Sequence, residues 1–188
     1  MDKFHRKYPS VLYLREKAKK RIPKFAFEYL DGGCNNEESL YKNTDDIRNI
    51  QLKPKYIVEK KETSIKTKLF GIEYDAPFGV APIGLQGLIW PKSPEILAKA
   101  AFDNNIPFIL STVSTSNIEK ISKITEGKAW FQLYHPAEDS ITRNILQRAE
   151  DSGIKNLVIL ADVPTFGYRN LEIINGLSKY SPFIKFIY

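Results

Sequence analysis

The chain has 188 residues and a mass of 21.6 kDa, enough for one domain with a sizeable core. Its hydrophobic fraction of 43% and charged fraction of 27% are ordinary for a globular chain, which argues against disorder, collagen and coiled coil. The longest apolar runs, such as residues 157–161, are far shorter than the roughly 20 residues of a membrane-spanning helix.

The net charge of +6 is concentrated at the N-terminus. Residues 1–24 hold nine Lys or Arg against Asp2 and Glu16, whereas the other 164 residues have a net charge of −1. A solvated face of a first helix explains this charge, and an anionic membrane surface or an acidic partner is the alternative. We expect no nucleic-acid partner, because no motif or aromatic-supported basic face accompanies these charges.

Signals for export and for metals are absent from the sequence. No apolar stretch follows Met1, so we expect a cytoplasmic protein, with peripheral membrane contact through the basic N-terminus as a variant. The single cysteine, Cys34, excludes an internal disulfide and fits a reducing compartment. No residue pattern predicts a metal site.

The first 77 residues are predicted to be helical and then extended. Helices are expected at 11–21 and 23–30, separated at Pro23, and a short one at 37–42 follows the Gly32-Gly33 break. Residues 50–77 are predicted to be an extended or hairpin lead-in around Gly71.

Strands and helices alternate from residue 78 to residue 162. Strands are predicted at 78–82, 107–110, 129–134 and 157–161, and helices at 96–105, 116–125 and 139–152. Ser93 is expected to cap the first helix, and Ser116-x-x-Glu119 has the capping-box pattern for the second. The fourth strand is apolar throughout, which predicts burial on both faces. This alternation indicates parallel strands with right-handed crossovers.

Two parallel architectures fit this pattern. A doubly wound sheet would have a dinucleotide fingerprint after its first strand, but residues 81–87 carry two glycines without that spacing. A (β/α)8 barrel needs eight units and typically ~250 residues, whereas this chain supplies four units. Polar groups follow all four strands, where barrel enzymes bind ligands: they are Pro82-Ile83-Gly84, Ser111-Thr112, Gln132-Leu133-Tyr134 and Asp162.

Five motifs in order resemble the N-terminal half of the FMN-dependent 2-hydroxy-acid dehydrogenase and oxidase family, which includes glycolate oxidase, lactate oxidase and dehydrogenase, and mandelate dehydrogenase. They are Ile22–Gly33, Ala81–Pro91, Leu110–Glu119, Trp130–Tyr134 and Ala161–Arg169. The resemblance implies a TIM-barrel fold truncated to about its first four β/α units. Residues 1–188 would then be one partial domain, with a helical cap and lead-in at 1–76, a half barrel at 77–169 and an unaligned tail at 179–188.

The resemblance also implies roles for individual residues. Pro82, Ile83 and Gly84 match a loop along the FMN ring, and Ser111 and Gln132 match side chains that bind its polar edge. Tyr29 and Arg169 match ligands of the substrate carboxylate. Tyr134 matches a tyrosine at the reacting oxygen of a 2-hydroxy acid that is oxidised to a 2-oxo acid. Asp162 matches the carboxylate that orients the catalytic histidine.

Departures from the family pattern limit this expectation. Leu160 stands where many members have a flavin-bonding threonine, and neither His5 nor His135 matches the catalytic histidine. We therefore expect these 188 residues alone to be inactive, because general-base catalysis is worth ~10²- to 10⁴-fold. A truncated, inactive fragment is one alternative function, and a basic-helix binding module is another. A homo-oligomer or a complementary half-barrel chain is the expected protein partner.

Overall fold

The computed structural model describes residues 3–59, 62–161 and 167–177. They fall into two compact units. The first unit contains residues 3–51 and 167–177, and the second contains residues 52–59 and 62–161. The predicted Asp162 and the tail at 179–188 lie outside the described residues.

Parallel strands form the centre of the second unit. Strand β3 (Ile109–Ser111) pairs with β4 (Trp130–Leu133), and β4 pairs with β5 (Asn156–Ile159), all in parallel. Val80 adds one parallel bridge to Phe108 beside β3, so the expected first strand is a single-residue pairing. The predicted alternation and the parallel direction are therefore confirmed, although the strands are shorter than expected.

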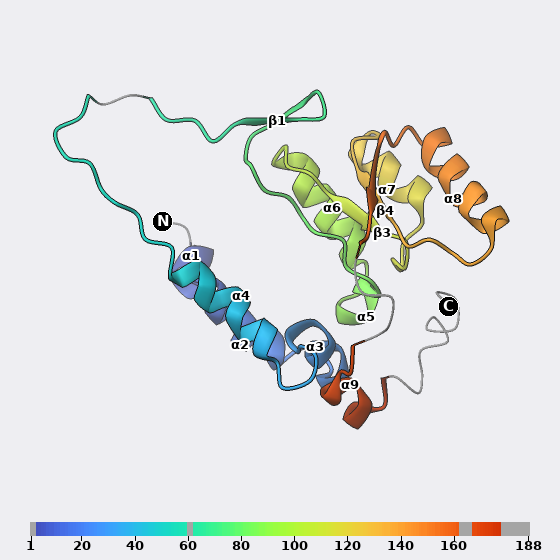
Figure 1. The fold of residues 1–188 in the computed structure, drawn as a ribbon, viewed down its shortest axis with the longest axis horizontal. Helices are drawn as coiled ribbons and strands as arrows, with labels where there is room; N and C mark the ends of the chain where they lie inside the picture. Colours follow the sequence, from blue (N-terminus) through green and yellow to red (C-terminus); the bar gives the residue numbers. More distant parts are fainter. Residues whose placement is uncertain (1–2, 60–61, 162–166, 178–188) are drawn as a thin grey trace. The chain divides into compact units, whose positions relative to one another are not determined.

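Three helices cover one face of this sheet: α6 (Ser93–Asp103), α7 (Ile118–Thr125) and α8 (Asp139–Asp151) (Figure 1). Leu110 and Phe131 are paired in register, and both project into the core that these helices close. Ala98 of α6 and Ile121 of α7 are fully buried there. Small residues on α6 let the helix approach the sheet closely, and the larger side chains of α7 and β4 fill the space between them.

A hairpin closes the end of the sheet where the strands begin. Strands β1 (Thr67–Leu69) and β2 (Ile72–Tyr74) pair antiparallel around Gly71, whose φ of 83° suits glycine. The Tyr74 hydroxyl accepts a hydrogen bond of 3.0 Å from Trp130 Nε1, which joins the hairpin to β4. The predicted hairpin is thus confirmed, and it leaves the opposite end of the sheet for the polar residues.

Helix starts differ from two predictions. Lys92, in the left-handed region at φ 59°, precedes α6, so Ser93 is the first residue of the helix rather than its cap. Asn117, not Ser116, caps α7, and its Oδ1 accepts the backbone N–H of Lys120 at 2.9 Å. The Ser116 hydroxyl donates instead to Glu95 at 3.2 Å, because the loop brings it beside the first turn of α6.

Strand β5 contradicts the prediction of burial on both faces. Leu157 is 44% exposed and Ile159 is 71% exposed, while Val158 between them is partly buried. Within the described residues β5 pairs with β4 alone and forms the edge of the sheet. The prediction of burial was wrong because the burial of a strand depends on its neighbours in the sheet. An apolar sequence does not show how many neighbours a strand has.

Five helices form the first unit. They are α1 (Lys3–Lys7), α2 (Val11–Lys19), α3 (Lys24–Asp31), α4 (Glu38–Arg48) and α9 (Asn170–Asn175). The predicted α2 and α3 are confirmed, α4 is longer than expected, and α1 and α9 were not predicted. Ala26 and Phe27 of α3 are buried. Asn170 Nδ2 donates to the Asn35 carbonyl at 3.0 Å, which fixes the start of α9 beside the loop that follows α3.

Candidate functional site

Ser111 and Gln132 lie side by side where β3 and β4 end. They are paired in register, so both side chains project from the sheet face opposite the helices. Both are buried, with exposed fractions of 4% and 1%. Within the described structure, Gln132 Nε2 has no hydrogen-bond partner. Because an unpaired buried amide costs roughly 1–3 kcal/mol, this donor is suited to a ligand that brings an acceptor.

The loop at Pro82, Ile83 and Gly84 follows the short parallel pairing at Val80. It is anchored to the loop that follows β3, since the backbone N–H of Leu85 donates to the Val113 carbonyl at 3.0 Å. Two residues on, the N–H of Gly87 donates to Thr115 Oγ1 at 3.0 Å, at the start of α5 (Gln86–Ile89). The predicted loop residues are therefore partly buried at the same end of the sheet as Ser111 and Gln132.

Thr112 joins the ends of β3 and β4. Its hydroxyl donates to the Gln132 carbonyl at 2.5 Å and accepts the backbone N–H of Tyr134 at 2.9 Å. These two bonds fix the backbone on both sides of Leu133. They therefore position the side chains of Gln132 and the half-buried Tyr134. The sequence marked Thr112 as a polar strand end but gave no role to it. A threonine at a strand end can hydrogen-bond nearby backbone groups, and this residue type is the sequence signal that could have predicted the role.

Tyr29 and Arg169 meet in the first unit although they are 140 positions apart. The Arg169 guanidinium lies over the Tyr29 ring at 5.4 Å, and its Nη2 donates to the Tyr29 carbonyl at 2.6 Å. A weaker bond of 3.3 Å runs from the same nitrogen to the Gly32 carbonyl. The two residues predicted to bind the substrate carboxylate are therefore neighbours. The backbone carbonyls of Tyr29 and Gly32 hold the arginine against α3.

Glu172 is the residue of this cluster that sequence reasoning missed. It forms an ion pair with Arg169 Nε from one turn further along α9. Burial raises the pKa of the Glu172 carboxyl, and the charge of Arg169 opposes that shift. Nη2 donates to the two backbone carbonyls, whereas Nε faces the Glu172 carboxylate as an ion pair and is buried without a hydrogen bond within the described structure. The spacing of three residues after Arg169 on a helix could have revealed Glu172.

The structure tests neither a base nor a metal in this site. Asp162 is outside the described residues, so its assignment stays a prediction. His135 is exposed, and its Nδ1 lies 2.7 Å from the Pro136 carbonyl. Among the described residues, no three His, Cys, Asp or Glu side chains are grouped so that they could hold a metal ion.

The strand-end residues fit the polar edge of a flavin. That edge carries carbonyl oxygens and ring nitrogens in one plane, and it needs donors that converge on it. Gln132 Nε2, unpartnered among the described residues, is such a donor. The Ser111 hydroxyl accepts the Val113 N–H at 3.3 Å, so its own proton can be donated outward.

Comparison with known proteins gives a consistent result. The family model described as FMN-dependent dehydrogenase matches residues 18–184. An L-lactate dehydrogenase of Vibrio cholerae serotype O1 (strain M66-2) is 38% identical over 164 residues, which are 87% of this chain and 43% of that protein. The L-lactate dehydrogenase of Caulobacter sp. (strain K31) is 35% identical over 90% of this chain and 44% of its own length.

Solved structures are similar over the same region. An active mutant of (S)-mandelate dehydrogenase superposes with a TM-score of 0.82 at 34% identity, covering 90% of this chain and 47% of that one. A mandelate oxidase with (S)-4-hydroxymandelic acid gives a TM-score of 0.85 at 30% identity, with 90% and 47% covered. The chain spans about half the length of these relatives, and it belongs to the FMN-dependent dehydrogenase family.

Proposed function

We propose that this chain supplies the flavin-edge and carboxylate-binding groups of an FMN-dependent enzyme that oxidises a 2-hydroxy acid to a 2-oxo acid. The names of its relatives, L-lactate dehydrogenase and mandelate dehydrogenase or oxidase, support a lactate- or mandelate-like substrate, and a glycolate-like one follows from the family resemblance alone. The observation that carries the proposal is the buried Gln132 Nε2 beside Ser111 at the strand ends, which has no hydrogen-bond partner among the described residues.

The fold proposal is that residues 77–169 are the first four units of a (β/α)8 barrel and that residues 1–76 are its helical cap and lead-in. Its support is the parallel order Val80, β3, β4, β5 with helices on one face. The polar groups also lie where such barrels bind ligands, at the carboxyl ends of the strands. The share of 43–47% of each relative that the chain covers is consistent with half a barrel.

Each residue has a defined task in this proposal. FMN, when bound, would supply the acceptor for the hydride of the substrate. Ser111 and Gln132 would donate to its polar edge, and the loop at 82–84 would support its ring. The Arg169 guanidinium and the Tyr29 hydroxyl bind the substrate carboxylate, since a guanidinium matches that group. Tyr134 binds the reacting oxygen.

The proton of the substrate hydroxyl needs a base near neutral pH, which a histidine held by a carboxylate such as Asp162 would supply. Neither His5 nor His135 matches it, so we propose that these 188 residues have no turnover by themselves. The exposed apolar side of β5 at Leu157 and Ile159 favours assembly with a second copy or a complementary half barrel.

Titration of FMN fluorescence tests the flavin-edge proposal. Gln132→Leu keeps the side-chain size and removes the donor, so we expect about tenfold weaker binding, the value of one hydrogen bond of ~1.4 kcal/mol. Gln147→Leu is the matched control, because Gln147 is on the outer side of α8, where it donates to Asp151. Equal FMN affinity in wild type and Gln132→Leu would exclude this role for Gln132.

A further inference from the structure

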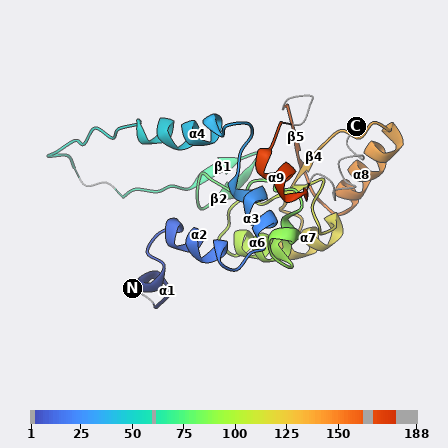
Figure 2. The ribbon, with the colours of Figure 1, turned by 90° about the horizontal axis from the view of Figure 1, so that it is seen from below.

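The loop between α3 and α4, residues 32–37, holds the segment that carries Arg169. The backbone N–H of Asn35 donates to the Tyr168 carbonyl at 2.7 Å, and the Asn35 carbonyl accepts a hydrogen bond from Asn170 Nδ2 at 3.0 Å. Asn35 therefore bonds both chain neighbours of Arg169. Helix α9, which follows Arg169, lies beside α3 and packs against it (Figure 2). The position of the Arg169 backbone thus depends on a loop from the other end of the chain.

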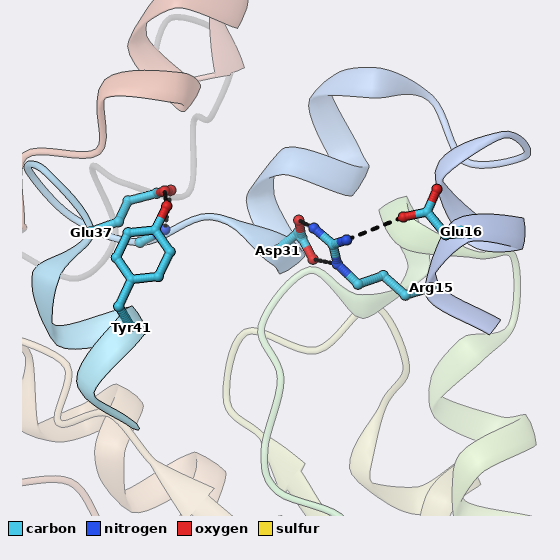
Figure 3. Close-up of polar contacts among 6 residues, drawn as sticks. Arg15, Glu16, Asp31, Glu37 and Tyr41 are labelled. Carbon is cyan, nitrogen blue, oxygen red and sulfur yellow. Dashed lines mark hydrogen bonds and ion pairs between the residues drawn. The ribbon is translucent and has the colours of Figure 1, made fainter. Parts of the chain in front are cut away.

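Glu37 closes this loop on itself. Its Oε1 accepts the backbone N–H of Gly33 at 3.0 Å, and its own N–H donates to the Cys34 carbonyl at 2.8 Å. The Tyr41 hydroxyl, in the first turn of α4, donates to the other carboxylate oxygen at 3.5 Å (Figure 3). Residues 34–36 between these contacts are exposed, so hydrogen bonds and not burial hold the loop in shape.

The backbone of Glu37 is strained. Its φ is 61°, in the left-handed region, which is unfavourable for any residue with a Cβ. Such strain persists only where surrounding contacts determine the conformation, and the bonds to Gly33 and Cys34 are contacts of this kind. A glycine would suit this backbone better but would carry no carboxylate. The glutamate at this position therefore indicates that the carboxylate has a role.

The turn that Glu37 closes also contacts Arg169 directly. The carbonyl of Gly32 accepts a hydrogen bond from Arg169 Nη2 at 3.3 Å. A Cβ at Gly32 would lie 3.2 Å from Leu171 Cδ1 of α9, which is tighter than ordinary van der Waals contact. Because Gly32 precedes the Gly33 that Glu37 binds, a shift of this turn would move an acceptor of the Arg169 guanidinium.

The carboxyl end of α3 is held separately, from α2. Arg15 Nε and Nη2 donate to the two carboxylate oxygens of Asp31, the last residue of α3, at 2.6 Å and 2.5 Å (Figure 3). A two-bond fork of this kind fixes direction as well as distance. The Tyr29 carbonyl, the other acceptor of Arg169, lies in this last turn of α3. Its position is therefore set by the fork and not by Glu37.

We propose that Glu37 is a positioning residue for Arg169. Its carboxylate closes the loop, and the closed loop holds the backbone on both sides of Arg169 and one acceptor of its guanidinium. This role rests on the proposed function, in which Arg169 binds the substrate carboxylate. A guanidinium grips a carboxylate through two parallel hydrogen bonds, so a small change in its orientation weakens binding. Glu37 acts through the loop and does not touch the substrate.

Phenylglyoxal modification of the full chain, followed by peptide mass spectrometry, tests this role. The Arg169 side chain is 31% exposed, so the reagent reaches it. Glu37→Ala should raise the modification rate of Arg169 about tenfold, the factor that corresponds to one lost hydrogen bond. The rate of Arg15, which is paired with Asp31, should stay within about twofold. L-Lactate should slow the modification of Arg169 in wild type and much less in Glu37→Ala.

Two further variants separate the carboxylate contact from general effects. Glu37→Gln keeps an oxygen that accepts the Gly33 N–H, so its Arg169 rate should stay within about twofold of wild type. Glu38→Ala is the matched control, because it removes the same charge from the exposed neighbouring residue at the start of α4. Its Arg169 rate should equal that of wild type.

An Arg169 rate in Glu37→Ala that equals the wild-type rate, or that rises as much in Glu38→Ala, would overturn the assignment. An equal rise at Arg15 and Arg169 would overturn it as well, since it would show a general loss of structure that circular dichroism also detects. Failure of L-lactate to protect wild-type Arg169 would contradict the proposed function instead. The rates without L-lactate would still decide the positioning role.

Discussion

Neighbouring strands β4 and β5 have similar apolar sequences and opposite environments. All four residues of β4 are buried, whereas β5 alternates between partly buried and exposed residues. The two strands are paired in register, with Phe131 opposite Leu157 and Leu133 opposite Ile159. Phe131 and Leu133 are buried in the core that the helices close, whereas Leu157 and Ile159, on the same face of the sheet, are exposed. An apolar run therefore indicates a strand, and its place in the sheet decides how many of its faces are covered.

The largest expected effect lies on the covered strand. Phe131 is 2% exposed in the main core, so Phe131→Ala should cost about 3–5 kcal/mol of unfolding free energy through lost burial and a cavity. Leu157→Ala, one strand across in the same register, should cost less than about 1 kcal/mol, since Leu157 is 44% exposed. Urea denaturation measures both. Similar losses at the two positions would remove the difference between the strands.

Gln132 tests whether β4 carries a polar group for function and not for stability. Within the part of the chain that the structure describes, its buried Nε2 has no hydrogen-bond partner. An apolar group of similar size removes that desolvation penalty, so Gln132→Leu should raise the unfolding free energy by about 1–2 kcal/mol. The same variant should bind FMN more weakly. A destabilised Gln132→Leu protein would instead show that the amide has partners that stabilise the fold.

Glu95 ties together two of the helices that cover β4. Its carboxylate accepts from Lys120 Nζ at 2.6 Å and from Ser116 at 3.2 Å. The hydrogen bond from Lys120 is the main reason that the pKa of Glu95 is below its ordinary value of 4.5, and burial opposes it. Ionised Glu95 thus stabilises the fold at pH values above its ordinary pKa. This contribution is lost as the pH falls through the lowered pKa of the folded state.

Glu95→Gln measures this contribution. At neutral pH the variant should lose about 1 kcal/mol of unfolding free energy. The loss is small because Lys120 is largely solvated, so water replaces the missing carboxylate. In acid the wild type and the variant should become equally stable. Thermal unfolding between neutral pH and pH values below the lowered pKa checks this, and a difference that persists in acid would contradict the assignment.

The smallest effect on stability is expected at the edge of β5. Ile159 is 71% exposed, so Ile159→Lys should change the unfolding free energy by no more than about 0.5 kcal/mol. Its effect should be seen in association, because a lysine on an edge strand discourages pairing with another chain. Sedimentation velocity should show less self-association for Ile159→Lys than for wild type. Unchanged self-association would exclude this edge as the contact.

Local patterns predicted most elements, and long-range contacts account for the errors. The spacing of apolar residues revealed α8, the Ser116-x-x-Glu119 pattern revealed α7, and Gly71 revealed the hairpin. Ser116 was misjudged as a cap because Glu95, 21 residues earlier, competes for its hydroxyl. The exposure of β5 depends on which strands lie beside it, which no local pattern contains.

The candidate site was predictable in residue type more than in detail. Strand ends located Ser111, Gln132 and Tyr134, and the family resemblance paired Tyr29 with Arg169. The Thr112 bridge between β3 and β4 depends on a register of strands 20 residues apart, so the sequence alone did not show it. The ion pair between Glu172 and Arg169 needed the helix α9, which the sequence analysis did not predict.

The central claim is that this chain holds the flavin-edge half of an FMN site. Its most direct test is gel filtration of the 188-residue chain in buffer that contains FMN, with absorbance recorded across the protein peak. The account predicts a folded protein that carries close to one FMN per chain above the buffer level, with less FMN in Gln132→Leu and the wild-type amount in Gln147→Leu. A folded protein with no FMN above the buffer level would contradict it.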